Sequence, residues 1–184
     1  MMQDETKSRG RRRSLGFLAR FLAFLVVFYF LVAWGPVNDA VIVPFTGAIA
    51  RVSSLVLSVL GEGTHVEGTE IRSDRFAVNI ENGCNGVETA LLFGSAVLAF
   101  PAPWKRRLAG LALGLVAIQL VNLVRVVSLF WIGVHRPSLF SSSHTVLWQS
   151  VVVLCGVLLF LLWATWGTGK RAAVVERHGA GKGR

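Results

Sequence analysis

Long apolar stretches divide the chain, and their lengths predict helices that cross a membrane. Three of them provide the ~20 consecutive, mostly apolar residues that a helix needs to cross a ~30 Å hydrocarbon core. They are Leu15 to Trp34, Leu108 to Val134 and Val146 to Trp166. A fourth stretch, Val87 to Pro101, is short but reaches a spanning length if its helix begins near Asn85 and ends near Trp104. The pattern therefore predicts about four transmembrane helices.

Residues 40–60 are also apolar on average, but their pattern is different. Apolar side chains recur there at helical spacing, while polar side chains gather on the opposite side of the helix. The apolar set is Val41, Phe45, Ala48, Val52, Leu55 and Val59, and the polar set is Thr46, Arg51, Ser54 and Ser58. This pattern is typical of an amphipathic helix that lies in the membrane interface. We expect such a helix on the outer face.

Basic residues form three clusters that flank the predicted spans and set the expected topology. The clusters are Lys7, Arg9, Arg11, Arg12 and Arg13; Lys105, Arg106 and Arg107; and Lys170, Arg171, Arg177, Lys182 and Arg184. Short cytoplasmic loops are rich in Lys and Arg, so all three clusters should be cytoplasmic. All three clusters can lie on one side only if residues 40–60 do not cross the membrane. The sequence thus predicts a multi-pass protein of the cell inner (cytoplasmic) membrane.

Composition agrees with this topology, since 53% of the 184 residues are hydrophobic and 16% are charged. The net charge of +9 would suggest nucleic acid in a soluble protein, but here the basic residues flank apolar runs and favour contact with anionic lipid. Two cysteines without a spaced Cys/His set indicate neither a disulfide framework nor a metal site, and no cofactor is predicted. We expect a basic cytoplasmic tail at 1–14, one membrane-embedded domain at 15–166 and a basic disordered tail at 167–184.

The one long polar stretch, residues 61–83, predicts a small extracytoplasmic β-hairpin. Its second half alternates, with Phe76, Val78 and Ile80 on one side and Ala77, Asn79 and Glu81 on the other. Residues 72–75 would form the turn after an extended run from Val66 to Ile71. The predicted fold is therefore an all-α membrane protein with about four spans, one outer interfacial helix and this hairpin.

Cys84 follows the hairpin, within the run Gly83-Cys84-Asn85-Gly86. Asn85 is a favoured N-cap and Glu88 stands three residues later, so a capping box would place Cys84 at a helix N-terminus. The helix dipole there favours the thiolate, which is the nucleophilic form. A small buried structural residue is the alternative. Cys155, in contrast, lies among apolar residues and is expected to be a packing residue.

Arg125 lies inside the longest apolar run, where an arginine at a helix centre costs ~2.5–3.5 kcal/mol on insertion scales. At ~1.5 Å per residue it stands roughly 26 Å from Leu108, close to the outer boundary, so its side chain could reach the interface by snorkelling. However, Gln119 and Asn122 precede it as a polar stripe. The stripe favours an enclosed site.

His144 opens the last predicted span at the same face of the membrane. The topology therefore puts Cys84, Arg125 and His144 at one depth, and a thiol, an imidazole and a fixed cation are the parts of nucleophilic acyl transfer. A histidine at this position is otherwise an ordinary interfacial residue. His65, His135 and Arg136 are on the same predicted side and stay open as alternatives.

These residues resemble the exosortase/archaeosortase family of membrane transpeptidases, most closely its exosortase H branch. The resemblance rests on Cys84-Asn85-Gly86 opening a span, on Asn122-Leu123-Val124-Arg125 near the outer end of the next span, and on His144 at the start of the last one. It covers roughly residues 80–166. Many relatives have more spans and a serine at the position of Asn85.

The resemblance implies a catalytic set of Cys84, Arg125 and His144. Asn85, Gly86 and Asn122 would bind substrate or support the site. The implied substrate is an exported protein with a C-terminal sorting signal made of a short motif, a transmembrane helix and a basic tail.

The predicted function is therefore a membrane cysteine transpeptidase or protease that cleaves such signals on the outer face through a Cys84 thioester. His144 would serve as the acid and base, and Arg125 would stabilise the thiolate or the oxyanion. Two alternatives stay open. One is a cysteine protease that only hydrolyses, and the other is a non-catalytic membrane assembly or lipid- or peptide-binding protein.

Overall fold

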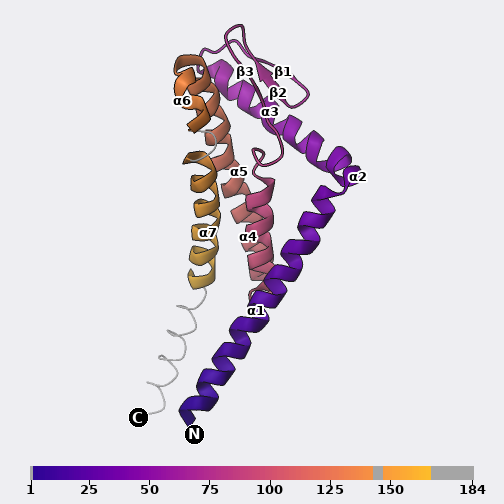
Figure 1. Cartoon of the computed structure of the whole chain (residues 1–184), viewed down its shortest axis with the longest axis vertical. Coiled ribbons are helices and arrows are strands. Elements are labelled where there is room, and N and C mark those ends of the chain that lie inside the picture. The colour runs from indigo at the N-terminus through magenta and orange to yellow at the C-terminus, as the bar shows by residue number, and fades with distance from the viewer. Residues whose placement is uncertain (1, 143–146, 167–184) are drawn as a thin grey trace, which may run out of the picture.

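The computed structural model describes residues 2–142 and 147–166 (Figure 1). The helices are α1 (Met2–Ala33), α2 (Gly35–Val37), the π-helix η1 (Asn38–Ile42), α3 (Val43–Val59), α4 (Val87–Ala99), α5 (Trp104–His135), α6 (Pro137–Ser142) and α7 (Gln149–Trp166). The strands are β1 (His65–Glu67), β2 (Glu70–Arg72) and β3 (Ala77–Asn79). The predicted class, a helical membrane protein with a small β-structure, is confirmed, whereas the outer position of that β-structure stays a prediction.

Four helical segments in the described residues are long and apolar enough to cross a membrane. They are Gly10–Ala33, Gly35–Val59, Trp104–His135 and Gln149–Trp166. Three of them, in α1, α5 and α7, contain or closely match the long spans expected from the sequence. The division of the chain into a domain at 15–166 and two tails stays a prediction.

The fourth predicted span corresponds to α4, which is shorter than expected. It has 13 residues, about 20 Å of helix. The prediction that it continues to Trp104 is wrong, because Phe100 is extended before Pro101 and because Trp104 already begins α5. A proline disfavours helical backbone in the residue before it, which explains the break.

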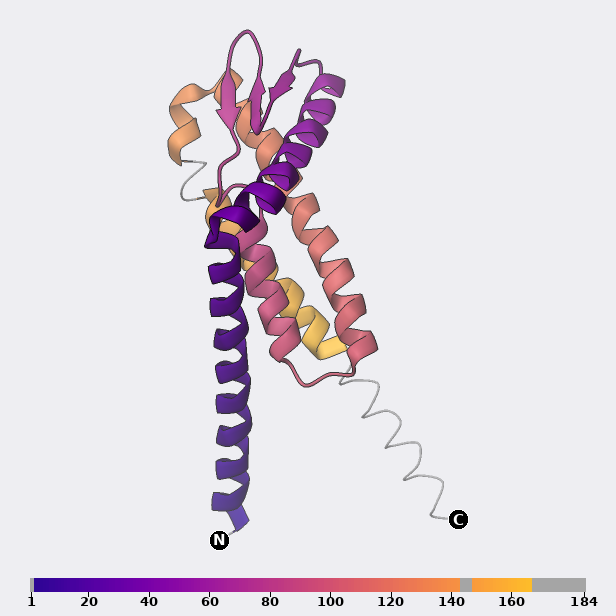
Figure 2. The ribbon, with the colours of Figure 1, turned by 90° about the vertical axis from the view of Figure 1, so that its right-hand side faces the viewer.

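The segment from residue 35 to 59 meets the length and composition of a span, yet its helix α3 runs obliquely across one end of the molecule (Figures 1 and 2). Its buried face is made mostly of small and polar residues, namely Thr46, Gly47, Ala50, Ser53 and Ser54, together with Leu57. The predicted apolar face is left exposed, with Leu55 at 67% and Val59 at 82%. The amphipathic pattern is therefore confirmed, with Thr46 and Ser54 of the polar face covered by protein and the apolar face free to contact lipid. The interfacial position of α3 stays a prediction.

The two ends of the molecule carry different elements, as the predicted topology requires. The start of α1, the loop 100–103 and the end of α7 lie toward one end, which we call the basic end (Figure 2). The strands and α6 lie at the other, which we call the sheet end (Figure 1). The basic clusters that precede the first span and begin α5 are thus together, whereas the third cluster lies outside the described residues. Which end is cytoplasmic stays a prediction.

Helices α4, α5 and α7 pack closely through glycines. A β-carbon added at Gly114 of α5 would overlap the ring of Phe93 on α4, and one at Gly110 would overlap the ring of Trp163 on α7. Small residues let helix backbones approach in this way within a membrane. This packing holds α4, which carries the loop of Cys84 at its start, against α5, which carries Arg125.

The polar segment between α3 and α4 forms a three-stranded antiparallel sheet in the order β1-β2-β3. The predicted turn at 72–75 is confirmed, since Ser73 N–H donates to the Phe76 carbonyl at 2.9 Å between β2 and β3. The predicted extended run from Val66 to Ile71 is wrong. Gly68 has φ +62°, which favours glycine, and it turns the chain so that Val66 pairs with Ile71.

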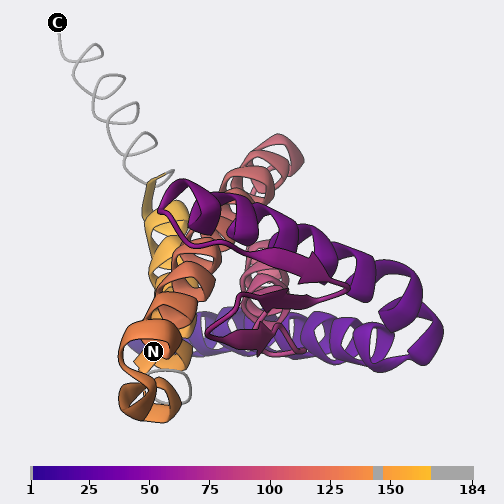
Figure 3. The same ribbon diagram turned by 90° about the horizontal axis from the view of Figure 1, so that it is seen from above.

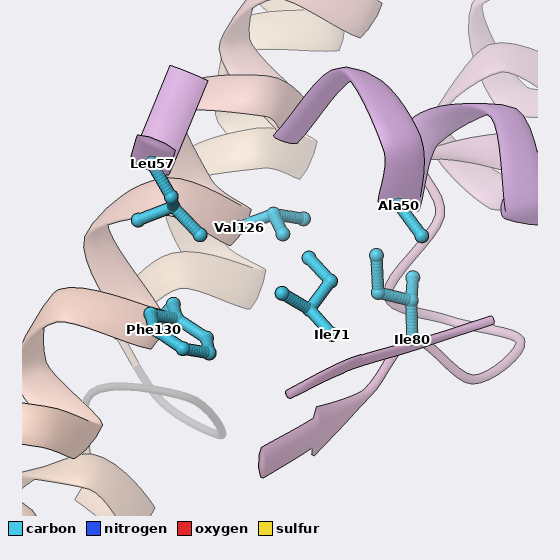
Figure 4. Packing of buried hydrophobic residues seen from close by; sticks show 6 residues of the cluster. All are labelled: Ala50, Leu57, Ile71, Ile80, Val126 and Phe130. Carbon is cyan, nitrogen blue, oxygen red and sulfur yellow. The ribbon is translucent and has the colours of Figure 1, made fainter. Parts of the chain in front are cut away.

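A small core joins this sheet to the helices (Figure 4). Ile71 and Ile80 pack with residues of α3 and α5, and Cys84 packs against the same cluster. The other buried members are Ala50, Leu57, Val126 and Phe130. Viewed from the sheet end, the strands lie over α4 (Figure 3). The core therefore fixes the position of the chain where it leaves the sheet and enters the Cys84 loop.

Candidate active site

The loop of Cys84 turns sharply between the sheet and α4. Gly83 has φ +92° and Gly86 has φ +76°, and both values lie in the left-handed region that glycine adopts without strain. The N–H of Cys84 donates to the Glu81 carbonyl at 2.9 Å. Gly83 before Cys84 and Gly86 after it thus define the direction of the Cys84 side chain.

Asn85 anchors this loop to α3. Its side chain is buried, its Nδ2 donates to Thr46 Oγ1 at 3.0 Å, and its Oδ1 accepts from the N–H of Val87 at 3.1 Å. The prediction that Asn85 is the N-cap in a capping box is wrong, because Gly86 is the N-cap and α4 begins at Val87. The burial of the Asn85 amide against Thr46 accounts for the difference. Asn85 therefore fixes the position of the loop that carries Cys84.

Arg125 reaches this loop from α5. Its guanidinium donates from Nη1 to the Gly83 carbonyl at 3.3 Å and from Nη2 to Cys84 Sγ at 3.4 Å. The residue is only 2% exposed, so its side chain does not snorkel to the surface, and that alternative is wrong. The planar fork of donors holds the loop backbone and the sulfur at the same time.

The partners of this guanidinium are uncharged in the resting protein. In the described part of the chain, no Asp or Glu oxygen lies within 4.0 Å of Arg125. A buried cation without an anionic partner is costly, and it strongly favours a negative charge placed beside it. A thiolate at Cys84, or an oxyanion formed next to it, would supply that charge.

The pKa of the Cys84 thiol is raised above its ordinary value. Burial is the largest cause, Arg125 acts in the opposite direction, and the carboxylates of Glu81 and Glu88 raise the pKa further. Cys84 also lies two residues before the N-cap, outside the first turn of α4. The prediction that its position favours the thiolate is therefore wrong for the resting protein. The chemistry requires a base.

The raised pKa predicts how Cys84 reacts with a charged, membrane-impermeant alkylating agent. Because only the thiolate reacts, alkylation should be slow near neutral pH and should still be rising above pH ~8.5, the ordinary thiol value. Cys155, within the apolar helix α7, should stay unmodified throughout. Modification of each thiol over a pH series can be followed by mass spectrometry. A rate for Cys84 that levels off below pH 8 would contradict the assignment.

The polar stripe on α5 lies beside the same loop. Asn122 is fully buried, and neither its Oδ1 nor its Nδ2 has a hydrogen-bond partner in the described part of the chain. The same holds for Gln119 Oε1 and Arg125 Nε. A β-carbon added at Gly86 would lie 3.1 Å from both Asn122 Cγ and Gln119 Nε2. Unpartnered buried polar atoms are rare in native proteins, so this stripe calls for an explanation.

The structure brings together five of the six residues expected in the site. Cys84, Asn85, Gly86, Asn122 and Arg125 lie on the loop and on the facing turns of α5. The sixth, His144, lies outside the described residues, and its position stays a prediction.

The alternative histidines and the alternative cation have other neighbours. His65 is on β1 with Nε2 3.9 Å from Glu67, and His135 stacks on Trp131 at 4.3 Å between ring centroids. Arg136 is exposed at the end of α5. These contacts favour none of the three as the partner of Cys84.

Sequence reasoning did not assign Thr46 to the site, and it considered Glu88 only as part of a capping box. Thr46 on α3 holds Asn85, but in the sequence it is one polar residue on an amphipathic face. Glu88 lies beside the loop, where a β-carbon at Gly83 would stand 3.4 Å from its carboxylate. Glu88 stands only four residues after Cys84, and this short distance was the available indication that it lies near the site. No group of three His, Cys, Asp or Glu side chains suited to a metal ion occurs within the described residues.

Fold and site together define a multi-pass helical membrane protein with a thiol beside a buried guanidinium, near the sheet end of the bundle. The family model described as transmembrane exosortase matches residues 10–165. The chain therefore belongs to the transmembrane exosortase family, as the resemblance implied. Comparison with curated proteins and with solved structures found no match. Its place in the exosortase H branch stays a prediction.

Proposed function

We propose that this exosortase is a cysteine transpeptidase that cleaves the C-terminal sorting signals of exported proteins. One observation carries the proposal: the guanidinium of Arg125, which is buried and has no carboxylate partner among the described residues, donates directly to Cys84 Sγ at 3.4 Å. Family membership supports processing of exported proteins in the membrane. The basic residues near the other end of the bundle support a site on the outer, extracytoplasmic side.

The first half of the reaction forms a thioester. A base removes the Cys84 proton, and the sulfur attacks the carbonyl carbon of the scissile peptide bond to give a tetrahedral oxyanion. The C–N bond then breaks, and the proton passes to the leaving amine of the C-terminal fragment. The raised pKa of Cys84 makes the base necessary. We assign this acid and base role to His144.

The second half of the reaction releases the N-terminal fragment. An amine or hydroxyl of an acceptor attacks the thioester carbonyl, the C–S bond breaks, and the proton lost by the acceptor returns to the thiol. Water in place of the acceptor would make the enzyme a hydrolase. Arg125 stabilises negative charge in both halves, because its fork lies beside the sulfur in a region of low dielectric.

Trapping with hydroxylamine tests the thioester. The protein in membranes is incubated with a polypeptide that carries a motif, a transmembrane helix and a basic tail at its C-terminus, which we call the tailed substrate. Hydroxylamine should divert the N-terminal fragment to a hydroxamate, which mass spectrometry distinguishes from the carboxylate that water produces. Cleavage that yields only carboxylate at every hydroxylamine concentration would argue against a transferable thioester.

A further inference from the structure

An apolar groove leads from the membrane-facing surface to the Cys84 loop. It has a volume of about 530 Å³ and lies between α3, α4 and α5, so we call it the α3–α5 groove. Phe45 and Val52 of α3, Leu91 of α4 and Leu120 of α5 are among the residues that line it, and among its described lining residues Gln119 alone is polar. Its surface is thus suited to an apolar occupant within the bilayer.

The groove is continuous with the candidate active site. Val87, the first residue of α4, lines it and stands three residues after Cys84. Gln119, which also lines it, is adjacent to Gly86. On α5 the lining runs from Leu115 to Leu123, about 12 Å or two turns of helix, and Arg125 stands two residues further along. An occupant of the groove would therefore reach the start of α4, next to the loop that carries Cys84.

The polar atoms at this end favour a peptide helix over a lipid chain. Gln119 Oε1 and the neighbouring Asn122 Oδ1 are buried acceptors with no partner in the described part of the chain. The first turn of any helix presents backbone N–H groups that have no acceptor within the helix. A lipid acyl chain has no such donors. The unpartnered acceptors at the junction thus match the start of a transmembrane helix.

We propose that the α3–α5 groove binds the first turns of the substrate's transmembrane helix, with Gln119 accepting a hydrogen bond from the N–H groups at its start. This inference rests on the proposed function and adds the surface that positions the scissile bond. The motif preceding the helix then lies against the Cys84 loop. Recognition of the substrate is in this way divided between an apolar groove and a polar junction.

A second groove of almost the same size provides a matched control. It has a volume of about 520 Å³ and lies between α4, α5 and α7, with Arg106, Leu113 and Trp166 in its lining. Leu120 of the first groove is 58% exposed and Leu113 of the second is 69% exposed, both on α5. The two positions share a helix, a residue type and similar exposure, but only one lies in the α3–α5 groove.

Site-specific photocrosslinking tests the inference. A photoreactive benzoylphenylalanine replaces Leu120 or Leu113 in the Cys84→Ala chain, so that the tailed substrate is not consumed. Strong adducts with the substrate from position 120, and weak or absent ones from position 113, are the expected result. Equal adducts from both positions, adducts from 113 alone, or adducts with lipid alone would overturn the inference.

Activity of chains that retain Cys84 separates this inference from the proposed function. Leu120→Trp fills the groove and should raise KM for the tailed substrate about tenfold, while Leu113→Trp should leave it unchanged. If the wild-type chain cleaves the substrate but Leu120→Trp does not differ from Leu113→Trp, the groove assignment is wrong and the function stands. If the wild-type chain does not cleave the substrate at all, the proposed function fails and the inference fails with it.

Discussion

Cys84→Ala is expected to abolish conversion of the tailed substrate while the protein stays in the membrane at normal abundance. The substitution removes the only atom proposed to form the thioester. It should cost little stability, since Cys84 is only partly buried and Arg125 keeps its hydrogen bond to the Gly83 carbonyl. The bonds of Asn85 that anchor the loop to α3 are also kept. Conversion is measured by the amount of cleaved N-terminal fragment at matched protein abundance.

Cys155→Ala is the matched control, because it makes the same chemical change within α7 and should leave conversion near the wild-type level. Full conversion by Cys84→Ala would place the nucleophile elsewhere. The alternative of a non-catalytic binding protein predicts a different result. The wild-type chain and Cys84→Ala would then bind the tailed substrate equally tightly, and neither would cleave it.

Much of this fold could be predicted because the bilayer imposes simple constraints on the sequence. Helix length and the Lys and Arg clusters indicated α1, α5 and α7 and placed the charged start of α5 at the end opposite the sheet. The amphipathic pattern of α3 held as well, although its polar face packs on the protein. The stripe of Gln119, Asn122 and Arg125 was visible because polar residues are rare within an apolar run.

What could not be predicted depends on contacts between residues far apart in sequence. Asn85 was assigned as an N-cap from local pattern, but its amide is bonded to Thr46, 39 residues away, and Gly86 takes the cap instead. The pKa of Cys84 was assigned from the helix dipole, whereas burial by the surrounding elements is its largest cause. Burial of this kind follows from tertiary packing, and the local sequence does not predict it.

The second large effect is expected from Arg125→Lys. Lysine keeps the positive charge but offers a point charge on a flexible stem, so it does not reproduce the two donors that reach the Gly83 carbonyl and Cys84 Sγ together. Conversion of the tailed substrate should fall on the order of 10²-fold or more, as when one oxyanion donor is removed. Protein abundance in the membrane should change little, because charge and approximate size are retained.

Arg136→Lys is the control for this comparison, since it makes the same change on an exposed arginine eleven residues along the chain, at the end of α5. It should retain wild-type conversion, and a large loss there would instead favour Arg136 as the functional cation. Near-wild-type conversion by Arg125→Lys would show that the planar fork is not needed. The contact between Arg125 and the sulfur would then have a structural role only, and the nucleophile would depend on Cys84 and its base without a fixed cation.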